Sequence, residues 1–405
     1  MLQDQLAEKR DEKRDPKDGR PGAAAAAPLV LANALVVTAE AAFRGRVTVF
    51  EGEIAEVAEG GAVPSGALDC EGDLLLPGLV DLHTDHCERH AVPRPGVHWD
   101  PLQAAIAHDA QVAAAGITTV FDSLVVGLRD ADQTRRDLLG RLMAAVEKGD
   151  ALGLFRSQHR LHLRCEVTDP TLLDQIEPLM DHALLRLVSV MEHTVGQRQF
   201  PDAGKYREVL VKLFDVPAEE VDERFRRDAE ASRTFAPTYR EAVCRLSQER
   251  GIPVAAHDDE TLEHVEEAVR LGMAISEFPT TLAAAEAARA KGMVTIMGAP
   301  NVVKGGSQTG NLSALDLARA GLLDALASDY VPISLLAATF RLTQADVGFS
   351  LPQAVRTASL APAEAVGLAD RGEIAPGKRG DLLRVRMVDD HPLVRTVYTG
   401  GQRVA

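Results

Sequence analysis

Imidazole and carboxylate side chains recur in this sequence at the ends of short apolar runs. Five runs end in this way: in His83 with Asp85, in Glu166, in Glu192 with His193, in His257 with Asp258 and Asp259, and in Asp329. Together these two groups suit Zn, Mn, Fe or Ni as a bound metal. A lone histidine at a strand end is more often a hydrogen-bonded structural residue. Several acids buried together without a cation would be costly, however, so the joint pattern predicts a divalent metal site.

The spacing of these residues suggests individual roles. His83 and Asp85 lie two residues apart, so on an extended strand both side chains point to the same side. His86 would point the other way unless the strand has already ended, and it ranks below Asp85 as a ligand. Two metal ions ~3.5–4 Å apart would activate water and polarise a phosphoryl or acyl oxygen. Asp329, at the end of the last run, is placed to accept the proton of the attacking water.

The elements that must bring these residues together are eight short strands alternating with helices. In five repeats a helical stretch ends at a glycine and an apolar run follows at once, at Gly116, Gly251, Gly272, Gly292 and Gly321. Glycine tolerates the left-handed backbone that ends a helix, and uniformly apolar strands are typical of parallel sheets buried on both faces. The pattern predicts a (β/α)8 TIM barrel, whose active-site residues lie where the strands end. A doubly wound sheet is the alternative, but no Gly-x-Gly-x-x-Gly motif follows the first strand.

The two ends of the chain are rich in β-forming residues and predict a second, smaller domain. We expect residues 29–74 and 372–405 to form a small β-sandwich, and residues 75–371 to form the barrel. Residues 1–28 combine mixed charges with an alanine run and predict a disordered tail. A charged insertion over residues 200–236 follows the fourth strand. It is a candidate lid, because loops at this face of a barrel often carry function.

The composition limits the partners and the compartment. The 405 residues include 44 basic and 60 acidic side chains, and the net charge of −16 argues against a nucleic-acid or acidic-membrane partner. No apolar stretch approaches the roughly 20 residues of a membrane span. Four scattered cysteines are too few for a disulfide framework, and without an apolar signal segment the sequence predicts a cytoplasmic protein. The expected partner is a small phosphorylated molecule, and a homo-oligomer is left open.

Several longer segments resemble the amidohydrolase superfamily. Residues 76–85 (Leu-Pro-Gly-Leu-Val-Asp-Leu-His-Thr-Asp) are similar to its opening signature, and residues 372–382 are similar to its return to the small β domain. More narrowly, the chain resembles the branch of that superfamily that acts in phosphonate utilisation. The matching segments include residues 93–99, 116–120, 159–166, 196–200, 277–281 and 297–301, and the resemblance covers residues 29–405.

The resemblance implies a metal-dependent hydrolase of phosphoric anhydride bonds. The implied reaction converts a ribosyl phosphonate 5-triphosphate to the 5-phosphate and pyrophosphate, in the carbon–phosphorus lyase pathway of phosphonate catabolism. The implied cofactor is one or two divalent ions; Zn is favoured, with Mn and Fe as alternatives. The same resemblance makes Asp329 catalytic and puts the metal-binding positions at His83, Asp85, Glu166, His193, His257 and Asp329.

Two positions depart from the superfamily pattern. The usual His-x-His pair is His83-x-Asp85 here, and no lysine stands at the strand end where a carboxylated lysine usually bridges the metals. Glu166 is the proposed substitute for that lysine. Both changes add negative charge, and they leave open the number of metals, the bridging group and whether His86 is a ligand.

A triphosphate substrate also needs cations beside the site. Arginine matches phosphate with paired donors, and a Gly-Gly-Ser turn can offer backbone N–H groups to an anion. Each loop arginine could instead be a solvated surface residue. Arg160 and Arg164 alternate with leucines in a predicted strand, so one of them is expected to pair with barrel carboxylates. The candidates in the loops are Arg89, Arg94, Arg198, Lys304, Gly305, Gly306 and Ser307.

Two other functions fit the same residues. The first is a cyclic amide hydrolase or deaminase of the same superfamily, which would not need the anion-binding loops. The second is a metal-holding scaffold without turnover, which would not need Asp329 opposite several metal ligands.

Overall fold

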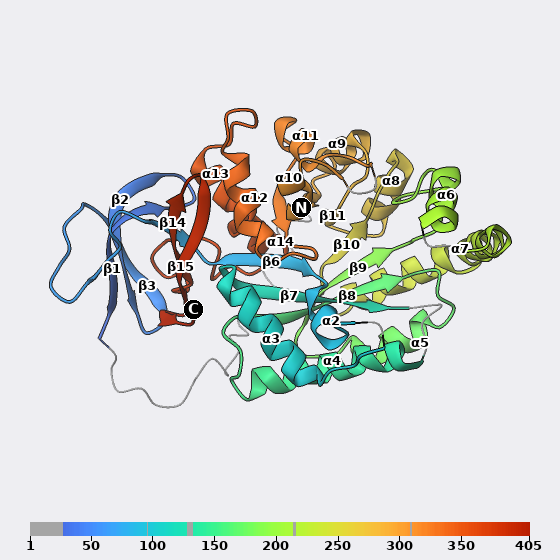
Figure 1. The fold of residues 1–405 in the computed structure, drawn as a ribbon, viewed down its shortest axis with the longest axis horizontal. Helices are drawn as coiled ribbons and strands as arrows, with labels where there is room; N and C mark the ends of the chain where they lie inside the picture. Colours follow the sequence, from blue (N-terminus) through green and yellow to red (C-terminus); the bar gives the residue numbers. More distant parts are fainter. Residues whose placement is uncertain (1–26, 95, 128–132, 214–215, 308–309) are drawn as a thin grey trace.

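Two sheets organise the chain (Figure 1). The computed structural model describes residues 27–94, 96–127, 133–213, 216–307 and 310–405. The disordered tail predicted for residues 1–28 therefore lies outside the described residues, apart from its last two positions. None of the described helices combines the length and the apolar character that crossing a membrane requires.

Eight parallel strands form the larger sheet, in the order in which they occur along the chain. A parallel bridge between Thr84 and Asp329 joins the first strand to the end of the last one and closes the ring. The order and the closure confirm the predicted (β/α)8 barrel. Its strands are β6 (Leu79–Thr84), β7 (Ile117–Val126), β8 (Gln158–Glu166), β9 (Leu185–Met191), β10 (Val254–His257), β11 (Ile275–Glu277), β12 (Val294–Gly298) and β13 (Ala325–Ala327).

Helices follow the strands and surround the barrel (Figure 1). After β6 to β9 come α2 (His86–Ala91), α3 (Pro101–Ala114), α4 (Gln133–Ala151), α5 (Leu172–Ile176) with the short η1 (Glu177–Leu179), α6 (Ala203–Leu213) and α7 (Ala218–Gln248). After β10 to β13 come α8 (Leu262–Arg270), α9 (Leu282–Ala290), α10 (Ala299–Lys304), α11 (Ala314–Arg319), α12 (Ser334–Leu342), α13 (Leu351–Thr357) and α14 (Leu360–Ala365).

The ends of these helices follow the chemistry predicted from the sequence. The side chain of Asp100 accepts a hydrogen bond from the Gln103 N–H at 3.0 Å, and Pro101 occupies the first position of α3. Such a cap satisfies a backbone donor that has no partner within the helix. The predicted glycines all have φ between 66° and 90°, as a helix-ending residue requires: Gly116, Gly251, Gly272, Gly292 and Gly321.

Side chains alternate between the inside and the outside of the barrel. On β7, Phe121 packs inside against Leu82 and Ile275, whereas Leu124 packs outside in the core formed with the helices. Successive residues of a strand point to opposite faces. Asp122 therefore faces outward, into the layer between β7 and the helices, although it is fully buried.

The carboxylate of Asp122 is the centre of a buried polar network in this layer. His108 of α3 lies with Nε2 2.8 Å from Asp122 Oδ1, and His159 of β8 has Nδ1 2.8 Å from Asp122 Oδ2. On its other side, His159 Nε2 lies 3.4 Å from Asp109, which also pairs with Arg156 at 3.0 Å. Burial alone would lower the pKa of His159, but the charges of Asp122 and Asp109 raise it to about 9. The imidazolium thus neutralises part of the buried acid.

The second sheet joins strands from both ends of the chain, as predicted. Its order is β16-β15-β14-β5-β1-β2-β3, with β4 paired to β1. Asp73 ties the two ends together, since its carboxylate pairs with Arg384 at 2.6 Å and with Arg386 at 2.7 Å. The strands are β1 (Leu29–Val37), β2 (Ala42–Phe50), β3 (Glu53–Glu59), β4 (Leu68–Asp69), β5 (Leu74–Pro77), β14 (Leu382–Val388), β15 (His391–Thr399) and β16 (Gln402–Arg403).

The two sheets meet at Gly78. The apolar run that reads as one strand in the sequence is split here, with β5 in the small sheet and β6 in the barrel. The Gly78 N–H donates to the Asp381 carbonyl at 2.8 Å. A Cβ at this position would lie 2.2 Å from the hydroxyl oxygen of Thr118, so only glycine fits the close approach.

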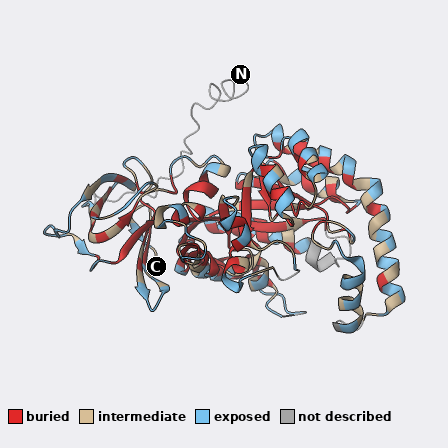
Figure 2. Cartoon of the chain, turned by 90° about the horizontal axis from the view of Figure 1, so that it is seen from above, coloured by how far each residue is buried: buried red, intermediate tan, exposed pale blue. Residues whose placement is uncertain are grey.

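The insertion between β9 and β10 forms the helices α6 and α7, which lie at the far end of the molecule from the small sheet (Figure 1). Figure 2 shows them projecting from the body with mostly exposed or half-buried residues. Tyr206 of α6 stacks between Phe200, at 4.3 Å, and Phe225 of α7, at 6.0 Å. Aromatic contacts therefore help to hold the projection together.

The junction between the sheets gives a stability prediction. We expect Gly78→Ala to lower the free energy of unfolding by about 1–3 kcal/mol, because the added methyl group would overpack against Thr118. Gly140→Ala is the matched control: it lies within α4, and a Cβ there would meet no described atom within 4 Å. It should raise stability slightly, since alanine favours helix over glycine. Urea denaturation of both variants measures the difference, and equal midpoints would contradict the close-packed junction.

The network around Asp122 gives a pH prediction. The pKa of His159 is raised from 6.5 to about 9, so its contribution to stability is complete below pH 6.5 and is lost as the pH rises through 9. We expect the unfolding free energy of the native sequence to fall by up to about 3 kcal/mol over that window. His159→Gln should lose this fall, whereas the exposed His391→Ala should keep it. A fall of the same size in His159→Gln would show that other groups cause it.

Candidate functional site

A buried carboxylate joins two of the predicted histidines at the rim of the barrel. Glu277, the last residue of β11, has Oε1 2.7 Å from His83 Nδ1 and Oε2 2.6 Å from His257 Nδ1. All three side chains are buried. If each imidazole donates its Nδ1–H to the carboxylate, its Nε2 lone pair remains available to a metal, an arrangement common in metal sites.

Polar contacts also fix the carboxylate of Glu277 itself. The Ser189 hydroxyl donates to Oε2 at 2.7 Å, and the same hydroxyl contacts Nε2 of His162, inside the barrel. Burial favours the neutral acid, but the charges and hydrogen bonds of His83 and His257 outweigh it and hold the pKa of Glu277 well below its usual value. The same carboxylate raises the pKa of His83 against the effect of burial. The Glu277 carboxylate is therefore ionised over the physiological pH range, and we call Glu277 with His83 and His257 the carboxylate clamp.

A second acid–imidazole pair stands beside the first. Glu166, the last residue of β8, has Oε2 2.8 Å from His193 Nδ1, and its Oε1 accepts a hydrogen bond from the Thr168 hydroxyl at 2.7 Å. The ring centres of His193 and His257 are 5.9 Å apart. These contacts bring the ends of β8, β9 and β10 to one place.

Asp329 is fixed by its backbone at the point where the barrel closes. Its N–H donates to the His83 carbonyl at 2.8 Å, and its carbonyl accepts from the Asp85 N–H at 3.1 Å. Burial raises the pKa of Asp329; the charge of His83 opposes the rise and that of Asp85 adds to it. A raised pKa suits a residue that must accept a proton from water.

Arg164 is the cation inside the rim. Its Nη1 lies 3.8 Å from Asp85 Oδ2, which agrees with the expectation that an arginine of this strand pairs with barrel carboxylates. Its charge also acts on His83 and Asp329, lowering the pKa of each relative to an uncharged neighbour. Arg164 therefore offsets part of the negative charge gathered at the strand ends.

Three strand ends continue into residues with an uncommon backbone conformation. Asp258 after β10, Phe278 after β11 and Asp329 after β13 have φ values of 58°, 57° and 57°. Non-glycine residues in this left-handed region cost free energy and gather at functional sites. The Phe278 ring lies against His83 and His257, with ring centres 5.0 and 5.4 Å apart.

The donor set at the rim fits a divalent metal. Asp85 Oδ1 is buried and makes no hydrogen bond within the described part of the chain, and neither does the buried Asp258 Oδ2, which lies 3.3 Å from His257 Nε2. A buried carboxylate oxygen without a donor is costly, and a cation would satisfy it. Ligand atoms of His193, His257 and Asp258 lie within 4.8 Å of one another. The structure thus brings the six predicted metal-site residues to a single rim and adds Asp258 and Glu277 to them.

Two of the predicted phosphate-binding cations lie in helices, Arg89 in α2 and Lys304 at the end of α10, whereas Arg94 and Arg198 lie in loops. Arg89 of α2 is exposed, with its guanidinium carbon 5.4 Å from the centre of the Tyr330 ring. Arg94 and Lys304 are also exposed. Arg198 is buried instead, and its guanidinium pairs with Asp259 at 2.7 Å. This pairing already occupies Arg198 with a structural partner.

The Gly-Gly-Ser turn is used differently from the prediction. The N–H groups of Gly305 and Gly306 both donate to the Asn301 carbonyl, at 3.1 and 3.0 Å, and so close the end of α10. Gly305 has φ 83°, as a helix-ending glycine requires. These two N–H groups are therefore not available to an anion. In this segment only the side chains of Lys304 and Ser307 remain candidates for binding phosphate.

Glu277 is the main residue that sequence reasoning missed. It closes β11, so the rule that identified the other strand-end acids applies to it as well. Glu192, in contrast, follows β9 beside His193 but forms an ion pair with Arg240, whose guanidinium lies 2.5 Å from Glu192 Oε2. His86 joins His90 and His108 rather than the rim histidines. Sequence position alone did not distinguish these cases, because it does not show which way each side chain points.

Comparisons with known proteins bear on the family and the fold. The model of the amidohydrolase family matches residues 74–404. The chain is 41% identical over 378 residues to α-D-ribose 1-methylphosphonate 5-triphosphate diphosphatase of Escherichia coli (strain K12), covering 93% of this chain and 100% of the relative. Two similar solved structures, each covering 93% of this chain, show the fold. N-acetylglucosamine-6-phosphate deacetylase of Pasteurella multocida has a TM-score of 0.60 at 14% identity over 99% of its chain. 5-Methylcytosine deaminase of Klebsiella pneumoniae has a TM-score of 0.63 at 15% identity over 98% of its chain.

The carboxylate clamp gives a prediction for metal affinity. Glu277→Gln keeps the shape of the side chain, but an amide offers only one oxygen to two imidazole donors. We expect the affinity of the rim for Zn²⁺ to fall about 10- to 100-fold, as is typical when the partner of a ligand is lost. Competition with a chelator measures it, with the exposed Glu286→Gln on α9 as the matched control. Unchanged affinity in Glu277→Gln would mean that the clamp does not orient ligands.

Proposed function

The chain belongs to the amidohydrolase family, and from that premise we propose that it hydrolyses α-D-ribose 1-methylphosphonate 5-triphosphate to the 5-phosphate and pyrophosphate, in phosphonate catabolism. The observation that carries the proposal is the similarity to the Escherichia coli diphosphatase, which extends over the whole length of that relative. The rim supports it physically, because buried acids and imidazoles converge there beside exposed cations.

The proposed cofactor is one or two divalent ions, with Zn favoured and Mn or Fe as alternatives. The residues that would hold them are His83, Asp85, Glu166, His193, His257 and Asp329. Bound there, a divalent ion supplies Lewis acidity at phosphoryl oxygens and lowers the pKa of the attacking water. Glu277 is proposed as the group that orients His83 and His257.

The side chains of this protein would handle the proton and the charge. In the reaction, the water oxygen bonds to one phosphorus of the anhydride between the α- and β-phosphates, and the bond from the bridging oxygen to that phosphorus breaks. Asp329 accepts the proton of the water, a role that its raised pKa favours. Arg164 lies inside the rim, where it can stabilise negative charge that develops on the phosphoryl oxygens.

The loops around the rim would bind the rest of the triphosphate. Arg89, Arg94 and Lys304 are the exposed cations proposed for this role, together with Ser307. The loop after α10 is tied to the loop after β9 by a hydrogen bond from Asn311 to the Gln199 carbonyl at 3.2 Å. Residues 200–236, which include α6 and α7 as far as Ala236, follow directly and are proposed as a lid over the substrate.

The proposal also covers the setting of the reaction. The substrate is a small phosphorylated molecule, and the net charge of −16 disfavours nucleic acid as a partner. All four cysteines are buried free thiols, which suits a reducing cytoplasm. Assembly into a homo-oligomer is compatible with the proposal and is not required by it.

The role of Asp329 gives the first test. We expect purified protein to release pyrophosphate from the ribosyl phosphonate triphosphate, and Asp329→Asn to lower kcat about 10²- to 10⁴-fold, because the amide cannot accept the proton. Asp174→Asn, an exposed substitution in α5, is the control and should keep full activity. An assay that separates pyrophosphate from phosphate, run also on nucleoside triphosphates, decides the outcome. Release of orthophosphate alone would reject the proposed reaction.

The loop cations give the second test, which also separates the proposal from its alternative. Arg94→Ala and Lys304→Ala should raise KM for the triphosphate by about tenfold each, with little change in kcat, because each removes a charge-assisted contact worth roughly 1.5 kcal/mol. A cyclic amide hydrolase or deaminase would cleave ring amides or aminopyrimidines with KM unchanged in both variants.

A further inference from the structure

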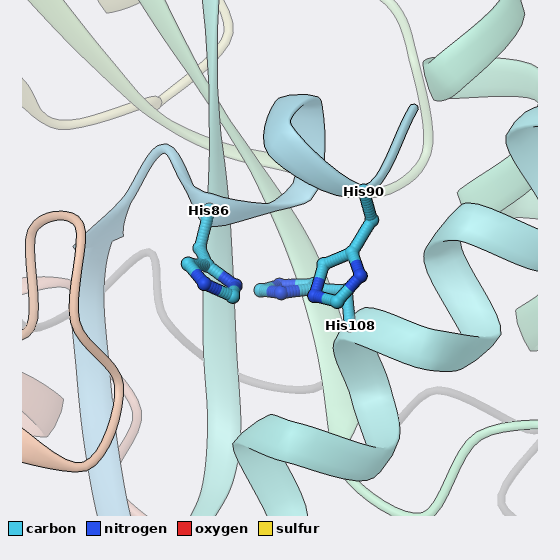
Figure 3. Close-up of side chains that lie close together, drawn as sticks. All are labelled: His86, His90 and His108. Atoms are coloured by element: carbon cyan, nitrogen blue, oxygen red, sulfur yellow. The ribbon is translucent and has the colours of Figure 1, made fainter. Parts of the chain in front are cut away.

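Three histidines outside the rim group point toward one another (Figure 3). His86 and His90 belong to α2, the short helix after β6, and His108 belongs to α3. Their ring centres are 4.9 Å apart for His86 and His90, 5.7 Å for His86 and His108, and 6.0 Å for His90 and His108. This cluster, the α2–α3 histidines, shares no residue with the site described above.

Each of the α2–α3 histidines has one ring nitrogen without a partner. His86 Nδ1, His90 Nε2 and His108 Nδ1 are all buried atoms that make no hydrogen bond within the described ranges. The His108 side chain is fully buried, so water does not solvate its free nitrogen. Three buried imidazole nitrogens without hydrogen bonds are costly unless something binds them.

The other nitrogen of His108 is held in the way that a metal ligand requires. His108 Nε2 lies 2.8 Å from Asp122 Oδ1. Burial alone would raise the pKa of Asp122, but the charges and hydrogen bonds of His159 and His108 outweigh burial, lower that pKa and keep the acid ionised. An ionised acid accepts a hydrogen bond from Nε2–H, and Nδ1 then carries the lone pair of the neutral imidazole. This carboxylate–histidine arrangement fixes the tautomer and increases the basicity of the ligand nitrogen.

The distances suit an ion after a small closure of the rings. One candidate ligand atom from each of the α2–α3 histidines lies within 4.8 Å of the other two. An ion equidistant from such atoms would be at most about 2.8 Å from each, and rotation of the rings by less than ~1 Å would give the ~2.0–2.1 Å of a zinc–imidazole bond. His86 and His90 are only half-buried, so a fourth ligand such as water can reach the ion.

We propose that His86, His90 and His108 bind a divalent transition-metal ion, separately from the rim of the barrel. Three neutral imidazoles favour Zn²⁺, Cu²⁺, Ni²⁺ or Co²⁺ over Mg²⁺ or Ca²⁺, which prefer oxygen ligands. The neighbouring group of His108, Asp122 and His159 is a different case, since carboxylates already occupy both ring nitrogens of His159. That group supports the ion site and does not form one of its own.

A metal ion at this place would tie α2 to α3. Helix α2 begins directly after Asp85, one of the rim residues, and it carries Arg89, whose guanidinium lies over the Tyr330 ring. The ion would therefore hold the loop that follows the first barrel strand in a fixed position. This consequence does not depend on the identity of the substrate.

The test is a metal titration of the full-length chain after removal of metal with a chelator. We expect the native sequence to bind one more equivalent of Zn²⁺ than either His86→Ala or His90→Ala. With Co²⁺, the visible absorption bands of a three-histidine site should appear in the native sequence and disappear in both variants. His391→Ala, an exposed histidine of β15, is the matched control and should behave like the native sequence.

A rim variant separates the two sites. His257→Ala should reduce binding at the rim and keep the Co²⁺ bands of the α2–α3 histidines. Circular dichroism and thermal unfolding confirm that each variant is folded, and the half-buried His86 and His90 are chosen over the buried His108 for that reason. Equal stoichiometry and spectra in native, His86→Ala and His90→Ala proteins would overturn the proposal. So would the loss of the same bands in His257→Ala, because both groups would then belong to one site.

Discussion

The functional rim depends on one ionised carboxylate held in the interior by two imidazoles. Glu277 is nearly inaccessible to solvent, and a lone charge in that position would be strongly disfavoured. His83, His257 and the Ser189 hydroxyl together supply three donors, which makes the charge tolerable and at the same time orients both rings. Since His83 and His257 come from different strands, the clamp also fixes the relative positions of β6 and β10.

Closure of the barrel brings further acids, Asp85 and Asp329, next to the carboxylate clamp. Asp329 shares backbone hydrogen bonds with His83 and Asp85. These bonds fix the end of the last strand beside the end of the first strand, next to His83 of the clamp. Closely spaced acids repel one another, and the rise in the pKa of Asp329 reflects that repulsion as well as burial. Arg164 offsets part of this negative charge from inside the barrel. The unsatisfied oxygen of Asp85 shows that the compensation is incomplete, which is the physical basis for placing a cation there.

The sequence predicted the features that depend on strand order and missed those that depend on pairing. The barrel, its glycine-terminated helices and the convergence of the strand-end residues follow from periodicity, because parallel strands place their ends at one rim. Arg198 was assigned to substrate, yet the structure buries it against Asp259. The sequence does not show whether the side chain of a loop arginine faces solvent or pairs with an internal acid. Glu277 was overlooked for the converse reason, since nothing local marks one strand-end acid as the shared partner of two histidines.

The state of both ring nitrogens distinguishes structural histidines from candidate ligands in this protein. His159 has carboxylates at Nδ1 and Nε2, so it is satisfied as an imidazolium and has no lone pair to give. His108 shares the same Asp122 but offers it only Nε2, and its Nδ1 has no donor or acceptor among the described residues. Evolution of a purely structural pair would be expected to fill or solvate that second nitrogen, as at His159. The asymmetry between two histidines on one carboxylate therefore argues that the α2–α3 histidines bind something that the chain itself does not supply.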